Sequence, residues 1–351
     1  DRKYGMVKIL YVDFHCNTWG HKRFNCELIS YLATFAKVDV LFQKGWYKDF
    51  PQNVEYEEIT LGKCQIGRFA SRINSLKIMA KARRMDLKKH YDYIFAASYE
   101  TLAFGLGRLL FPKPNRIFIV HHNNLDSINH KIIDLVFRNY ANRVNHLVLE
   151  KFIGDYLVEE YGVDRTQITC LPHPMNRNNS NDEKVYACVG ISNSNDETII
   201  SEIVSLEKKE KLLWKAQKKV VLRSKEQTFD NGYLKVITGY LDDEEYNHYI
   251  NSAQSILILF PNTFCNRMSG TIIDALSNFA MIYGTDIPVI RVFSERYPSL
   301  CYMFHSGNEL IHMICHQNIE GKQAEYRQFQ NEHSSQAITE LLKTLFIVRN
   351  K

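Results

Sequence analysis

The sequence has few features of a membrane-spanning, disulfide-bonded or zinc-binding protein. Its eight cysteines lie far apart and form no Cys-x-x-Cys pair, which excludes a disulfide framework or a zinc site of that kind and favours a reducing cytoplasm. The longest apolar runs, such as 256–261, are far shorter than the roughly 18 residues that a membrane-spanning helix needs. The sequence also lacks Gly-x-Gly-x-x-Gly and Walker-type Gly-Lys-Ser/Thr motifs, so classical dinucleotide binding and P-loop nucleotide binding lack support. It has no Asp-x-Asp metal-binding motif either.

What is present is enough apolar material for two globular domains. The 351 residues are 45% hydrophobic and 24% charged, which excludes a disordered chain or a coiled coil. In the first half, short β-rich runs alternate with stretches of helical periodicity such as 24–35. We expect strands at 7–12, 37–42, 93–97, 116–120 and 146–149. Because parallel strands need crossover connections, this alternation predicts a parallel sheet covered by helices on both faces.

The chain changes character at Leu171-Pro-His-Pro174, which two prolines hold extended, and the Asn-rich stretch 177–183 that follows indicates a linker. Afterwards the alternation resumes, with strands expected at 185–189, 219–222, 234–237, 255–260 and 281–283. We therefore expect an N-terminal α/β domain at 1–176, a C-terminal α/β domain at 177–333 and a C-terminal helix at 334–351 that can pack back on the first domain. Ligands of such sheets bind at the carboxyl ends of the strands.

The segment 260–278 carries the most specific chemical signal. A strand ends there, and a loop leads through Arg267 to Ser269-Gly270-Thr271, where a helix begins. Free N–H groups and the dipole at a helix start suit a phosphate, and a guanidinium two residues earlier can share that anion. Asp274, one turn into the helix, is placed to accept hydrogen bonds from a ribose diol. The alternative is an ordinary N-cap with a surface arginine beside it.

This loop and helix, followed by Ile282-Tyr-Gly-Thr-Asp-Ile-Pro-Val289, resemble the nucleotide-sugar segment of GT-B fold glycosyltransferases. The likeness is to the large bacterial retaining family of polysaccharide and cell-surface glycan transferases. Gly239-Tyr-Leu-Asp-Asp-Glu-Glu-Tyr246 resembles that family's glycine loop, and 146–174 resembles the end of its first domain. The resemblance implies two tandem Rossmann-like domains facing a central cleft, with a UDP-type or GDP-type sugar donor held by the second domain.

The sequence also departs from the family. The usual pair of glutamates would fall at Asn266 and Asp274, and the usual cations after the first strand of the second domain are missing. Arg223 and Lys225, after the next strand, are available to neutralise a diphosphate, although a role as surface charges is equally open. The donor-binding candidates are therefore Gly20, Arg223, Lys225, Tyr240, Asn266, Arg267, Met268, Ser269, Gly270, Thr271 and Asp274.

The first domain carries polar loops that could meet the acceptor. Asp13 and His15 follow the first strand in a loop that closes on Gly20, and either side chain could act as a base on a hydroxyl group. His121 and His122 end another strand, and the resemblance implies that one of them touches the donor sugar. The catalytic candidates are Asp13, His121 and Asp126, with Ser98 and Glu100 as further acceptor-side residues. His173, between two prolines, favours a structural role, and no metal ligands are expected.

Positive charge is concentrated in the first half of the chain. Between Lys63 and Lys89 there are nine basic residues and one acid, with apolar residues interleaved. This pattern predicts either a solvated helix face or a helix resting on anionic headgroups, and nucleic acid binding is disfavoured because no aromatic stacking platform accompanies it. The acceptor-side or membrane-side candidates are Arg68, Arg72, Lys77, Lys81, Arg83 and Arg84.

Together these features predict a cytoplasmic, metal-independent glycosyltransferase without a cofactor, peripheral on the inner face of the cell membrane. It would transfer a sugar from a nucleoside diphosphate to a glycan acceptor, one carried on a lipid in the synthesis of a bacterial surface polysaccharide or glycoconjugate. Two alternatives remain open. One is a GT-B subunit that binds a glycan or protein partner without catalysis, and the other is a sugar-nucleotide epimerase.

Overall fold

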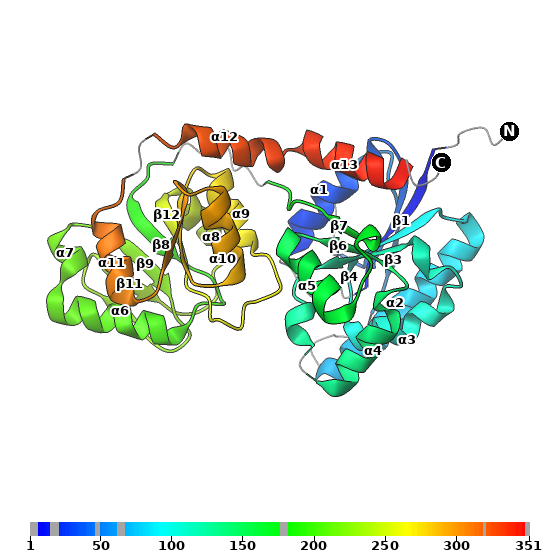
Figure 1. The fold of residues 1–351 in the computed structure, drawn as a ribbon, viewed down its shortest axis with the longest axis horizontal. Coiled ribbons are helices and arrows are strands. Elements are labelled where there is room, and N and C mark those ends of the chain that lie inside the picture. The colour runs from blue at the N-terminus through cyan, green and yellow to red at the C-terminus, as the bar shows by residue number, and fades with distance from the viewer. Residues whose placement is uncertain are drawn as a thin grey trace. The chain divides into compact units, whose positions relative to one another are not determined.

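The structure, a computed structural model, describes residues 6–14, 21–45, 50–61, 67–128, 130–175, 182–318 and 321–347, without the side chains of residues 67 and 68. The chain folds as two compact units (Figure 1). The first comprises 1–174, 266–268 and 334–351, and the second comprises 175–265 and 269–333. Among the described residues, no helix combines the length and the apolar content needed to cross a membrane.

The first unit is built on a seven-stranded sheet in the order β3-β2-β1-β4-β5-β6-β7, and all its strand pairs are parallel. The central strands are buried on both faces, because helices cover both sides of the sheet. The order reverses between β1 and β4, which is where sheets of this type bind ligands. The strands are β1 (Lys8–Asp13), β2 (Lys37–Gln43), β3 (Glu55–Ile59), β4 (Tyr93–Ser98), β5 (Ile117–His121), β6 (Asn145–Val148) and β7 (Ile168–Cys170).

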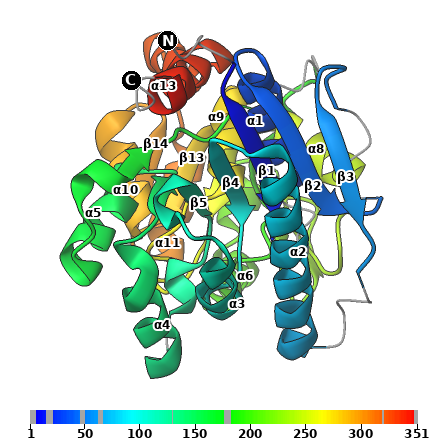
Figure 2. The same cartoon turned by 90° about the vertical axis from the view of Figure 1, so that its right-hand side faces the viewer.

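Helices α2 to α5 cover one face of this sheet, where a buried core includes Ile78, Phe104, Phe137 and Ile153. On the other face α1 packs beside the C-terminal helix α13 (Figure 2). Phe346 of α13 contacts the rings of β4 and β5. The α-helices of the first unit are α1 (Lys22–Ala33), α2 (Gly67–Lys89), α3 (Thr101–Gly107), α4 (Lys131–Ala141), α5 (Lys151–Tyr161) and α13 (Ser335–Ile347). Its 3₁₀ turns are η2 (Arg108–Leu110), η3 (Pro114–Arg116), η4 (Leu125–Ser127) and η5 (Arg165–Gln167).

The second unit repeats this plan with the order β10-β11-β9-β8-β12-β13-β14, in which only β10 and β11 pair antiparallel. Its strands are β8 (Tyr186–Gly190), β9 (Val220–Arg223), β10 (Phe229–Asp230), β11 (Leu234–Ile237), β12 (Ala253–Ile258), β13 (Met281–Thr285) and β14 (Cys301–Phe304). Close packing of the sheet leaves no room for a side chain at Gly284, where a Cβ would lie 2.5 Å from Ile290 Cδ1.

In the second unit α6, α7 and α11 share one buried core with the strands, while α8 and α9 pack on β12 and α12 packs on α9. The helices are α6 (Glu197–Glu210), α7 (Leu212–Lys215), α8 (Asp243–Asn251), α9 (Gly270–Ser277), α10 (Pro288–Arg296), α11 (Gly307–Cys315) and α12 (Gln323–Glu332). Two parallel-dominated sheets, each between layers of helices, confirm the predicted α/β class with two Rossmann-like domains.

Candidate functional site

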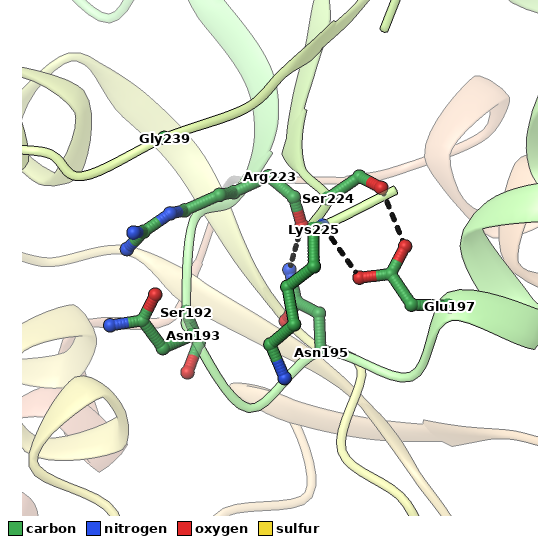
Figure 3. A pocket seen from close by; sticks show the side chains of 8 residues that line it. All are labelled: Ser192, Asn193, Asn195, Glu197, Arg223, Ser224, Lys225 and Gly239. Atoms are coloured by element: carbon green, nitrogen blue, oxygen red, sulfur yellow. Dashed lines mark hydrogen bonds between the residues drawn. The ribbon is translucent and has the colours of Figure 1, made fainter. Parts of the chain in front are cut away.

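The second unit has a cavity of about 280 Å³ where β8, β9 and β11 end (Figure 3). This position agrees with the rule that ligands of such sheets bind beyond the carboxyl ends of the strands. The cavity is lined by Ser192, Asn193, Asn195, Glu197, Arg223, Ser224, Lys225 and Gly239. It therefore brings together the two cations that the sequence suggested for a diphosphate and the glycine that begins the predicted glycine loop.

Two side chains hold the loops around this cavity together. Asn195 is buried, and its Nδ2 donates to the carbonyl oxygens of Gly190, 2.8 Å away, and Arg223, 3.0 Å away. Glu197 accepts from Ser224 Oγ at 2.5 Å and from the backbone N–H of Lys225 at 2.8 Å. Because both oxygens of Glu197 bind the loop, the loop after β9 is fixed by the carboxylate while the Lys225 side chain extends away from it (Figure 3).

The cations of the cavity are not neutralised by neighbouring acids. In the part of the chain that the structure describes, neither Arg223 nor Lys225 has a carboxylate at ion-pair distance from its side chain. Burial lowers the pKa of Arg223, whereas the nearby Tyr240 raises it, and a guanidinium remains protonated in either case. Two positive charges without acidic partners in a pocket of this size suit an anionic ligand such as a diphosphate.

The loop after β11 supplies the rim of the cavity. Gly239 has φ of +97°, in the left-handed region that side chains with a Cβ adopt at a cost, so glycine is favoured there for conformational reasons. Tyr240 follows it and is largely exposed, with no core role that would explain an aromatic ring at this position. An exposed ring beside a polar pocket is available to stack on a planar ligand.

The start of α9 lies after β12. Ser269 is the N-cap residue, its side chain forms no capping hydrogen bond, and a Cβ at Gly270 would meet no atom within 4 Å, so the space beside Gly270 is open. Asp274 accepts a hydrogen bond from Tyr246 Oη at 3.1 Å, and the same hydroxyl lies 3.4 Å from Thr271 Oγ1. The carboxylate predicted to bind ribose is therefore positioned by a tyrosine of α8.

Three further donor-binding candidates, Asn266, Arg267 and Met268, are grouped with the first unit. The carboxylate of Asp126 accepts from the backbone N–H of Asn266 at 2.7 Å and pairs with Arg267 at 3.0 Å, and Met268 is buried. In this arrangement Arg267 is bound to an acid rather than held ready for an anion, and Asp126, one of the predicted bases, carries a neutralising partner.

A smaller cavity of about 170 Å³ lies in the first unit, where β4 and β5 end. Its polar lining, with two amides, hydroxyl groups and imidazoles, is chemically suited to a sugar hydroxyl. The cavity is lined by His21, Ser98, Tyr99, Glu100, Thr101, His122, Asn123, Asn124, Ser127 and Ile133. Ser98, Glu100 and His122, all named from the sequence, thus lie together.

The two adjacent histidines have different surroundings. His122 lines the cavity, hydrogen-bonded to the carbonyl of Ala97 at 3.0 Å and in edge contact with His21. His121 faces the core, where its ring lies 3.1 Å from Tyr99 Oη and 2.8 Å from His146, whose other nitrogen lies 2.7 Å from the Ala141 carbonyl. Burial lowers the pKa of both His121 and His122 well below its usual value. Of this pair, therefore, His122 has access to the cavity.

The remaining base candidates of the first unit are also constrained. Asp13 is buried and accepts hydrogen bonds from Ser98 Oγ and, at 3.4 Å, from Asn25 Nδ2. His15 and Gly20 lie outside the described residues. His173 contacts its neighbour's carbonyl, and its ring packs on Phe24, as a structural residue would.

The basic segment forms α2, and several of its cations are paired within the first unit. Arg72 pairs with Glu100, Lys81 with Glu57, Arg83 with the buried Asp86, and Lys89 with Asp39 and Glu55. By contrast, Lys77, Arg84 and Lys88 are exposed and have no acidic partner among the described residues. Lys63 lies outside the description, as does the side chain of Arg68.

The described residues contain no group of three or more histidine, cysteine or acidic side chains arranged to hold a metal ion. The sequence alone did not single out Asn195, Glu197 or Ser224. A signal was present, since Asn195 and Glu197 follow the buried strand 185–189 closely in a polar stretch. Their role becomes visible only when β8 and β9 are seen to be neighbours.

No family model and no curated protein matches the chain. Solved structures do match over almost the full length. Sucrose-phosphate synthase from Thermosynechococcus elongatus is 11% identical, with 98% of this chain and 99% of that chain covered and a TM-score of 0.70. Anabaena HepE in complex with UDP and glucose is 12% identical, with 97% and 100% covered and a TM-score of 0.65. UDP-N-acetylglucosamine 2-epimerase from Rickettsia bellii is 11% identical, with 99% and 98% covered and a TM-score of 0.57. At these identities the likeness concerns architecture, and it confirms the predicted resemblance: the chain has the fold of GT-B glycosyltransferases.

Proposed function

We propose that the chain is a glycosyltransferase that moves a sugar from a nucleoside diphosphate sugar, of UDP or GDP type, to a glycan acceptor. The observation that carries this proposal is the cavity of the second unit, which Arg223 and Lys225 both line beside a glycine loop, without an acidic partner among the described residues. HepE, a protein of the same fold, has been solved with UDP and glucose, which supports the choice of donor.

In this proposal the second unit stabilises the departing diphosphate. Negative charge grows on the diphosphate as the bond between its oxygen and the anomeric carbon of the donor sugar breaks, so preorganised cations lower the barrier. Arg223 and Lys225 supply two such charges, and Asn195 and Glu197 fix the loops that carry them. These cations perform the neutralisation that a metal ion performs in other transferases, so the proposed step needs no metal.

In this proposal the first unit binds the acceptor. We assign contact with a sugar hydroxyl to His122, with Glu100 and Asn124 as neighbours in the same cavity, because His121 and Asp13 are enclosed in hydrogen bonds. Asp126, which pairs with Arg267, remains a candidate base. The acceptor is a lipid-linked glycan in surface polysaccharide synthesis, which makes the protein cytoplasmic and peripheral to the membrane, and the family resemblance favours retention at the anomeric carbon.

Calorimetric titration with a panel of nucleoside diphosphates tests the donor site. We expect binding of UDP or GDP, weakened about 10- to 100-fold by Arg223→Ala, since a hydrogen bond to a charged group contributes roughly 1.5–3 kcal/mol. Lys235→Ala, an exposed cation of the same unit outside the cavity, is the matched control and should bind as the wild type does. If no nucleoside diphosphate binds, the transferase proposal is wrong.

A sugar-nucleotide epimerase is the second candidate, because an epimerase also shares the fold. Incubation with the nucleoside diphosphate sugar alone distinguishes an epimerase from a transferase. An epimerase converts the donor without any acceptor, whereas a transferase releases nucleoside diphosphate, slowly to water and faster once an acceptor is added. Tight nucleotide binding without turnover under either condition would instead support the non-catalytic subunit.

A further inference from the structure

One surface of the first unit is unusually apolar. Of the fifteen large hydrophobic side chains that are exposed in the described part of the chain, eight lie on α2, α3 with η2, and α4. We call this surface the outer face, and its apolar members are Phe69, Ile73, Leu87, Leu106, Leu109, Leu110, Ile132 and Leu135. Phe69 is 75% exposed and Ile132 is 71% exposed, so these side chains project into solvent rather than filling gaps between helices.

The three helices form one continuous layer. Figure 2 shows α2, α3 and α4 side by side below the sheet, and glycines permit their close approach. A Cβ at Gly107 of α3 would lie 2.3 Å from Met79 Sδ of α2, and a Cβ at Gly105 would lie 2.3 Å from Val136 Cγ1 of α4. The inward sides of these helices are buried in the core, so the exposed leucines and isoleucines belong to the opposite, outward side.

Basic residues outnumber acidic residues on these helices, although acids of neighbouring elements pair with Arg72, Lys81, Lys89 and Arg138. Helices α2 and α4 with the α3–η2 turn contain eleven basic and two acidic residues. Both acids are bound to arginines, since Asp86 pairs with Arg83 and Arg116 while Asp134 pairs with Arg138. In the described part of the chain no acid pairs with the exposed Lys77, Arg84 and Lys88, which act as uncompensated charges beside the projecting apolar side chains.

We propose that the outer face docks the protein on the surface of an anionic lipid bilayer. Apolar side chains enter the boundary between headgroups and acyl chains, and long basic side chains reach the headgroup phosphates. The apolar side chains are largely exposed and are spread over three helices, which favours a broad, deformable partner over an acidic protein. This inference deepens the proposed function. It rests on that function in one respect, namely that the acceptor is carried on a lipid.

Vesicle flotation of the full chain tests the proposal. The vesicles contain either phosphatidylcholine alone or a mixture with phosphatidylglycerol, and each is used at low and high salt. We expect binding to the anionic vesicles at low salt, weakened by salt because exposed charges are screened. Replacing Lys77, Arg84 and Lys88 by Glu should reduce partitioning at least about 100-fold, since each lost cation alone weakens binding several-fold.

The apolar contribution is tested separately by replacing Leu106, Leu109, Ile132 and Leu135 with Ser, which should reduce partitioning at least about 10-fold. The matched controls lie in the second unit: Phe279→Ser for an exposed apolar residue, and Lys209, Lys215 and Lys235 replaced together by Glu for charge. Circular dichroism verifies that every variant is folded.

Binding that persists in the outer-face variants, or that falls equally in the controls, overturns the proposal. So does the absence of flotation, which would leave an acidic protein as the partner of this face. The result is independent of the transferase proposal, because flotation needs no nucleotide and nucleotide titration needs no vesicle. A variant that no longer floats but still binds UDP or GDP would show that the two activities belong to different surfaces.

Discussion

The buried pair His121 and His146 should make the first unit sensitive to mild acid. The Ala141 carbonyl can only accept a hydrogen bond, so His146 Nε2 carries a proton and donates it. His146 Nδ1 then accepts from His121 Nε2, and His121 Nδ1 accepts from the hydroxyl of Tyr99. Every nitrogen is satisfied with both rings neutral, and an added proton would place a positive charge in the buried core.

The size of the effect follows from the pKa of His146, which burial lowers to about 4. An unfolded histidine has a pKa of about 6.5, and each pH unit between the two values contributes roughly 1.4 kcal/mol, so that the full difference is about 3 kcal/mol. At a pH between these two pKa values, His146 is protonated in the unfolded chain and neutral in the folded chain. The free energy of unfolding therefore has its full value above pH 6.5 and falls as the pH drops toward 4.

Hydrogen exchange of peptides covering β5 and β6, corrected for intrinsic exchange rates, measures this local stability at pH 7.5 and pH 4. His146→Gln removes one titrating ring, so the variant should lose about 3 kcal/mol less than the wild type on acidification. At pH 7.5 the same variant should be less stable by about 1–3 kcal/mol, because His121 loses its acceptor. His248→Gln, on the surface of the second unit, serves as the control replacement. Equal losses in wild type and His146→Gln would refute the reasoning.

Three other substitutions test packing and loop geometry. Glu197→Ala removes no proposed ligand contact, but Ser224 Oγ and the Lys225 N–H lose their acceptor. The change should therefore weaken nucleoside diphosphate binding about 3- to 30-fold in calorimetry. Affinity equal to the wild type would show that the loop needs no such support. Gly284→Ala should lower the free energy of unfolding in urea by about 1–3 kcal/mol, since its Cβ would collide with Ile290. Phe346→Ala should cost about 3–5 kcal/mol in the same assay by removing the ring that packs on Tyr93, Phe95 and Phe118, and a smaller loss would mean that α13 is held mainly by other contacts.

The central strands of both sheets could be predicted from the sequence, because each is buried on both faces and appears as a short apolar run. The strands missed by the sequence reading are β3, β7, β10 and β14, which lie at the edges of the sheets. Strand β3 is Glu-Tyr-Glu-Glu-Ile and mostly exposed, a composition typical of an edge strand that discourages pairing with another molecule. Its pairing with β2 gives it a strand conformation that its own sequence does not signal.

The two histidines at the end of β5 show why the site was harder to predict. Neighbouring residues of a strand face opposite sides, but β5 is buried on both faces, so its sequence shows no alternation to tell which side chain enters the core. His121 is in register with Val148, next to a strand that supplies a second buried histidine, His146. Only this tertiary pairing assigns His121 to the core and leaves His122 to the cavity.

For the basic residues, too, the sequence does not show which side chains are neighbours in the fold, whereas the structure does. From the sequence alone the cations of 63–89 form one cluster, whereas Arg223 and Lys225 are isolated residues of the other half. In the structure Arg83, Lys81 and Lys89 neutralise acids of their own unit, so they add to stability rather than to attraction for a ligand. Positive charges without acidic partners repel one another, which destabilises the fold unless an anionic ligand offsets the repulsion. Such charges gather beside a cavity in the second unit and beside projecting leucines in the first, which is why we assign a small anion to the former and a lipid surface to the latter.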